Sequence, residues 1–124
     1  MDETRRTQIR DLLSALKVSL SREQGEVFWT DSRNTVMAGG EGSGKSFLGA
    51  LRAFTWGLTE PRTLLGWLIG DDFEDARREM DLVIQFAEAL GVLDRKSSTI
   101  STHQDQKCRV RIYSPAMLTL PAIE

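Results

Sequence analysis

Eight consecutive residues in the first half of the chain combine backbone freedom, a positive charge and hydroxyl groups. They are Gly39, Gly40, Glu41, Gly42, Ser43, Gly44, Lys45 and Ser46. Glycine adopts positive-φ conformations and lets backbone amides approach a ligand without a clash from Cβ. Lysine adds a mobile positive charge, and a serine hydroxyl is a ligand that Mg²⁺ accepts. This combination predicts a site for a polyphosphate and its metal ion.

The spacing of these residues fits the phosphate-binding loop pattern G-x-x-x-x-G-K-[ST] at every defined position. An apolar run precedes the loop and a helical pattern follows it, so a chance glycine-rich turn is the weaker alternative. We predict that the loop from Gly39 to Ser46 binds ATP. Lys45 is the predicted catalytic contact to the β- and γ-phosphates, and Ser46 is the predicted Mg²⁺ ligand. The loop amides and the dipole of the following helix add positive potential for the phosphates.

Gln24 is a second candidate contact for the nucleotide, fifteen residues before Gly39. Two compatible roles stay open for its side chain. Ser21 and Gln24 stand at the spacing of a capping box, in which the glutamine closes the start of a helix. The same amide both donates and accepts hydrogen bonds, so it matches the edge of an adenine base.

The elements that must position this loop follow from the apolar pattern. Short apolar runs predict buried strands, and apolar residues at helical spacing predict amphipathic helices. Alternation of polar and apolar residues near the carboxyl end predicts a hairpin. The predicted elements are helices over 3–18 and 21–29, a strand over 35–38, a helix over 45–58, a strand over 64–69, a helix over 73–91 and a hairpin formed by 99–102 and 107–113.

This order of elements predicts an α/β fold like that of a P-loop NTPase. It consists of a strand–loop–helix unit, a second strand–helix unit and a carboxyl-terminal hairpin. We predict two parts, an N-terminal helix over residues 1–19 and a partial P-loop ATPase domain over 20–124 that stops before a Walker B strand.

Hydrolysis of ATP needs a carboxylate near the metal ion, and Asp71 and Asp72 are the candidates. As a Walker B pair, one of them would hold Mg²⁺. In the alternative interpretation, Asp72 caps the helix that begins at residue 73. The glycine at position 70 and the short separation from Lys45 fit the helix cap better.

Composition places this chain among ordinary globular proteins. It has 124 residues, 40% of them hydrophobic, and a net charge of -2, so overall charge does not direct it to nucleic acid. One cysteine excludes an intramolecular disulfide. No apolar stretch reaches the length of a membrane-spanning helix, and no apolar leader opens the chain. We therefore expect no membrane contact and a cytoplasmic location.

Six segments of the chain suggest a family. They are Leu20–Gln24, Trp29–Arg33, Met37–Ser46, Gly66–Phe73, Ala76–Met80 and Cys108–Ser114. Together they resemble the start of the ATPase domain of bacteriophage terminase large subunits, over residues 20–114. The resemblance implies a motor that uses ATP to pump double-stranded DNA into a capsid. It further implies a ring of subunits on the portal, a small terminase subunit as partner, and the host bacterial cytoplasm as location.

Two departures from the family pattern affect the expected activity. Glu41 stands inside the loop, where many family members carry arginine or lysine. The sequence also ends before a Walker B Asp-Glu pair or the nuclease carboxylates of the family. We therefore expect an ATP-binding segment of a terminase-like motor that hydrolyses little ATP alone. A non-hydrolysing nucleotide-binding module or regulator, and a small P-loop kinase, are the alternatives.

Overall fold

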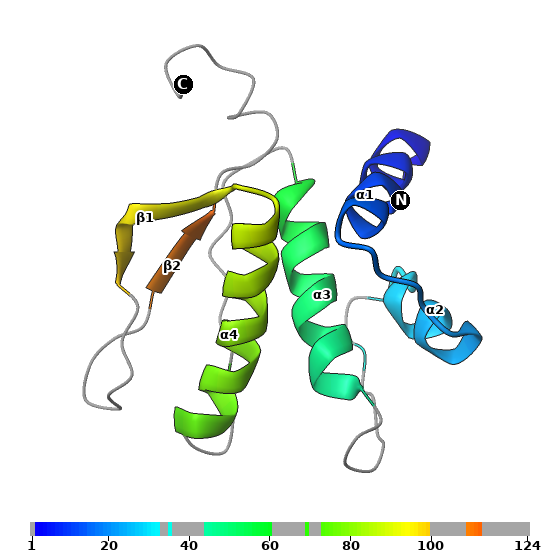
Figure 1. Cartoon of the computed structure of the whole chain (residues 1–124). Coiled ribbons are helices and arrows are strands. Elements are labelled where there is room, and N and C mark those ends of the chain that lie inside the picture. Colours follow the sequence, from blue (N-terminus) through cyan, green and yellow to red (C-terminus); the bar gives the residue numbers. More distant parts are fainter. Residues whose placement is uncertain are drawn as a thin grey trace.

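The computed structural model of the chain describes residues 2–32, 35, 44–60, 69, 73–99 and 109–112. In this part of the chain, four helices are followed by a two-stranded antiparallel sheet (Figure 1). The elements are α1 (Glu3–Ala15), α2 (Arg22–Phe28), α3 (Lys45–Leu58), α4 (Phe73–Ala89), β1 (Leu93–Thr99) and β2 (Arg109–Ile112).

The predicted α/β layout of a P-loop NTPase is wrong. The sheet in the described residues is antiparallel and follows the helices, whereas the prediction places strands between them. Thr35 lies outside any strand, and Ile69, expected in a buried strand, is 82% exposed. Residues 36–38 and 64–68, which complete the two predicted strands, lie outside the described residues. The helices bury their apolar faces against one another, so the described core contains no sheet layer of the predicted kind.

All four predicted helices are confirmed, with ends that differ from the expected ones by up to three residues. Local side chains fix the starts of α1 and α2. The carboxylate of Asp2 accepts a hydrogen bond from the amide of Arg5 at 2.8 Å and caps α1. Ser21 caps α2 in the predicted capping box with Gln24. Gly91, with φ at 68°, ends α4 as its position in the sequence predicts.

The centre of the core is the contact between α3 and α4, which lie side by side in Figure 1. The ring of Phe86 on α4 packs 5.6 Å from that of Phe47 and 5.8 Å from that of Phe54, both on α3. The other buried apolar residues of this cluster come from all four helices and from the position just before β1: Ile9, Leu13, Phe28, Leu48, Ala50, Leu51, Leu58, Val83, Ala87 and Val92.

The two-stranded sheet begins earlier in the chain than the predicted hairpin. Its first strand covers residues 93–99, whereas the first strand of the predicted hairpin covered residues 99–102. Leu93 pairs with Ile112 and Thr99 with Arg109, and a bulge separates these two pairs. Within the bulge, the Ser98 hydroxyl accepts from the amide of Arg111 at 3.0 Å and donates to the carbonyl of residue 94 at 2.5 Å. The polar first strand is thus stabilised by hydrogen bonds of the Ser98 side chain at the bulge. Apolar alternation in the sequence does not mark a strand of this kind.

Candidate functional site

The start of α3 carries the last three residues of the predicted phosphate loop. Gly44 is the N-cap residue, with φ at 83° and ψ at 12°, and no side chain caps the helix. Lys45 and Ser46 form the first turn and are exposed. The first amides of a helix have no partner within the helix, and the helix dipole makes this end positive. The exposed first turn of this helix can therefore bind an anion.

Glycine is favoured at position 44 for two reasons. Its φ angle is one that L-residues with a side chain rarely adopt. A Cβ at this position would also lie 3.2 Å from Nε2 of Gln24, which is a tight contact. The structure thus brings Gln24 from α2 against the start of α3, twenty residues further along the chain.

The capping role predicted for Gln24 is confirmed. The side-chain Oε1 of Gln24 accepts a hydrogen bond from the backbone amide of Ser21 at 3.0 Å. The backbone amide of Gln24 donates to the Ser21 hydroxyl at 3.2 Å. The acceptor end of the side chain is therefore occupied, while the donor end lies beside Gly44. Contact between this glutamine and adenine stays a prediction.

The rest of the predicted site lies outside the described residues. This applies to Gly39, Gly40, Glu41, Gly42 and Ser43, and also to Asp71 and Asp72. Of the predicted site residues, the structure places Gln24, Gly44, Lys45 and Ser46, and it brings Gln24 into contact with the glycine that precedes the lysine.

Arg52, two turns further along α3, was not among the site residues predicted from the sequence. Its Nη2 donates to the carbonyl of Thr30 at 2.8 Å, and its Cζ lies 4.4 Å from the centre of the Trp56 ring. Thr30 follows Trp29, the C-cap residue of α2, and belongs to the segment that leads toward the loop. The spacing of four residues between Arg52 and Trp56 is a signal for a helical pair. The bond to Thr30 has no sequence signal.

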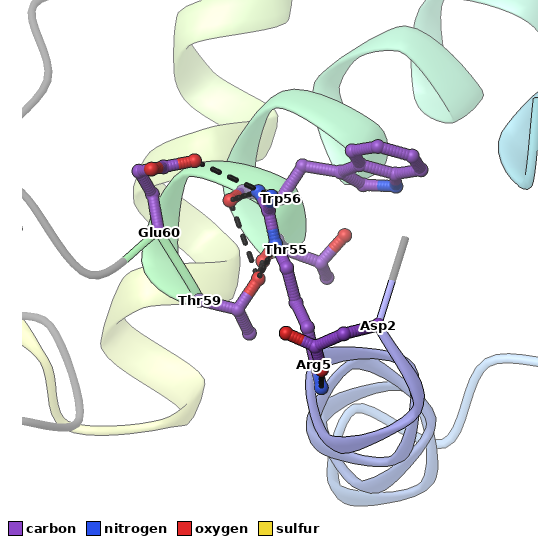
Figure 2. Close-up of polar contacts among 6 residues, drawn as sticks. All are labelled: Asp2, Arg5, Thr55, Trp56, Thr59 and Glu60. Carbon is purple, nitrogen blue, oxygen red and sulfur yellow. Dashed lines mark hydrogen bonds and ion pairs between the residues drawn. The ribbon is translucent and has the colours of Figure 1, made fainter. Parts of the chain in front are cut away.

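Arg5 makes a separate set of contacts at the other end of α3, shown in Figure 2. Its Nε donates to the Thr59 hydroxyl at 3.1 Å, its Nη2 donates to the carbonyl of Trp56 at 2.7 Å, and its Nη1 lies 3.3 Å from Oε2 of Glu60. A cation that binds the last carbonyls of a helix is favoured by the helix dipole. Arg5 therefore holds α1 on α3 and lies away from the candidate site.

In the part of the chain that the structure describes, no group of three or more His, Cys, Asp or Glu side chains is arranged to hold a metal ion. None of the described helices is both long and apolar enough to cross a membrane.

Comparison of the chain with known protein families, curated proteins and solved structures finds no match.

Proposed function

We propose that this chain binds the phosphates of Mg-ATP with the loop Gly39–Ser46 and the first turn of α3. The observation that carries the proposal is the conformation of Gly44. This residue starts a 14-residue helix from a left-handed backbone, without a capping side chain, directly before an exposed Lys45 and Ser46. A phosphate can accept hydrogen bonds from the amides of such a turn, and the lysine adds a charge-assisted contact.

Within this function, the resemblance of residues 20–114 to terminase large subunits suggests the biological role. The chain would act as the ATP-binding segment of a DNA-packaging motor in the host bacterial cytoplasm. Its partners would be double-stranded DNA, a small terminase subunit, the portal and further copies of the chain. Release of phosphate from ATP, stimulated by double-stranded DNA, would support this role. Binding of ATP without release would favour the non-hydrolysing module.

The direct test of nucleotide binding is Lys45→Ala. Loss of a charge-assisted contact to phosphate should weaken Mg-ATP binding by about tenfold or more, as measured by titration calorimetry. Lys96→Ala is the matched control, because Lys96 is an exposed lysine on β1, outside the site. This control should bind like the unchanged protein. Equal affinity of Lys45→Ala and the unchanged chain would refute the proposed function.

A further inference from the structure

Arg52 connects α3 to the segment that precedes the phosphate loop. Its Nη2 donates to the carbonyl of Thr30 at 2.8 Å. Its guanidinium lies on the ring of Trp56, with Cζ 4.4 Å from the ring centre. Stacking on an aromatic ring restricts the orientation of the planar guanidinium, so little further side-chain freedom is lost when it donates to a fixed carbonyl. The contact therefore holds Thr30 at a defined place on α3.

Local bonds also fix the backbone around Thr30. The amide of Ser32 donates to the Thr30 hydroxyl at 3.3 Å, and this hydroxyl donates to the Ser32 hydroxyl at 3.1 Å. Trp29, the residue before, is the C-cap of α2 and packs edge-on against Phe28. The chain is thus fixed where it leaves α2.

The other end of the loop is fixed by the same helix pair. Gln24, in the first turn of α2, lies against Gly44 at the start of α3. Arg52 follows Lys45 by seven residues, which corresponds to about 10 Å along the axis of α3. Thr30 and Gly44, the two residues that flank 31–43, are therefore held at a set separation by α2 and α3.

We propose that Arg52 is a positioning residue for phosphate binding: it fixes on α3 the point, at Thr30, from which the chain leads toward the phosphate loop. This role rests on the proposed function of the loop. Fixing the ends of a segment restricts its conformations before binding, and such preorganisation raises affinity without a new ligand contact. Arg52 itself lies two helical turns from Lys45 and acts through the backbone at Thr30.

The test compares Arg52→Met with Arg5→Met. Both variants remove an arginine that stacks on Trp56, but only Arg52 binds the carbonyl of Thr30. With Mg-ATP and with Mg-tripolyphosphate as probes, Arg52→Met should weaken binding by about five- to tenfold, because the preorganisation lost can reach at most about the value of the one hydrogen bond removed. Arg5→Met should bind within about twofold of the unchanged chain. Equal weakening by the two variants would show a general effect of lost stability and would refute the positioning role.

Two further measurements separate this role from a long-range charge effect. Arg52→Lys keeps the positive charge but lacks the planar guanidinium that stacks on Trp56, so it should recover little of the lost affinity, whereas a charge effect predicts that it recovers most of it. The weakening by Arg52→Met should also persist between 0.15 M and 0.5 M salt, about the range over which attraction between distant exposed charges is screened. A loss that disappears at high salt would overturn the positioning role.

Three results remain distinguishable. If the unchanged chain does not bind either probe, or if Lys45→Ala binds them equally well, the proposed function fails and the positioning role with it. If Lys45→Ala weakens binding and Arg52→Met does not, only the positioning role fails. Should Arg52→Met not fold, Trp56→Leu replaces it, because loss of the indole frees the guanidinium of Arg52. This variant should also weaken binding of both probes, and unchanged binding would contradict the inference.

Discussion

At the scale of single residues, the backbone is strained at one helix end and relaxed at another. Lys17 follows α1 with φ at 58°, and Gly91 follows α4 with φ at 68°. The hydrogen bonds are equivalent at the two ends. The amide of the positive-φ residue binds the carbonyl three residues back, at 3.0 Å for Lys17 and 3.1 Å for Gly91, and the next amide binds the carbonyl five residues back. The two ends therefore differ in the residue type and share one geometry.

This pair gives a clean prediction for stability. Lys17→Gly should raise the free energy of unfolding by about 1 kcal/mol, because glycine adopts this conformation without a Cβ clash. Gly91→Ala should lower it by about 1 kcal/mol for the same reason. A Cβ at Gly91 meets no atom within 4 Å, so backbone strain alone is measured. Urea unfolding followed by circular dichroism gives both values.

The control for this pair is Lys17→Ala. It removes the same charge and the same long side chain as Lys17→Gly but keeps Cβ, so stability should change by less than about 0.5 kcal/mol. Equal stabilisation by alanine and glycine would show that the lysine side chain, and not the backbone angle, is unfavourable.

At the scale of secondary-structure elements, α1 is held on α3 by a side chain that binds a helix end. Arg5 is largely buried, with 24% of its side chain exposed, and binds the carbonyl of Trp56, the hydroxyl of Thr59 and the carboxylate of Glu60 (Figure 2). The last carbonyls of a helix have no partner within it. The guanidinium of Arg5 therefore binds one of these carbonyls, that of Trp56, and connects two elements that are far apart in the sequence.

We expect Arg5→Met to lower the free energy of unfolding by about 2 kcal/mol, because it removes charge-assisted hydrogen bonds from a partly buried site. Arg22→Met is the matched control. Arg22 pairs with Glu26 at 3.6 Å on the surface of α2, where 88% of the arginine side chain is exposed. Exposed pairs of this kind contribute less than about 0.5 kcal/mol. Urea titrations that give the same loss for both variants would contradict a role for Arg5 in holding α1.

At the scale of the whole molecule, the described helices share one core. Phe86 on α4 packs against two phenylalanines of α3, and buried residues of α1 and α2 complete the same cluster. Phe86→Ala should lower the free energy of unfolding by about 3–5 kcal/mol. That is a large share of the roughly 5–15 kcal/mol that stabilises a typical domain. Thermal melting of this variant, followed by circular dichroism, measures the loss.

The neighbouring variant Gln85→Ala tests whether burial is the cause, because Gln85 is exposed on the same helix. It should leave the melting temperature almost unchanged. A shared core also predicts one cooperative transition for the unchanged chain. Two separate transitions, one of them for α1, would contradict the shared core and support an N-terminal helix that folds as its own unit.

The sequence by itself determined the features that arise from neighbours in the chain. The Ser21–Gln24 capping box, the start of α3 after Gly44 and the end of α4 at Gly91 were all predictable. Their bonds span three to five residues, so the local sequence contains both partners. Helical periodicity also marked the face of α3 that becomes buried.

Only the tertiary structure decided the contacts between distant segments. An apolar run predicted a buried strand up to Ile69, yet this residue is exposed, because burial depends on which other elements cover a segment. The strand over 93–99 carries little apolar alternation and forms through pairing with β2. Arg5 and Arg52 bind backbone carbonyls on other segments, and a carbonyl has the same chemistry at every residue. Spacing in the sequence therefore cannot reveal such bonds, and only the packed arrangement of the helices selects them.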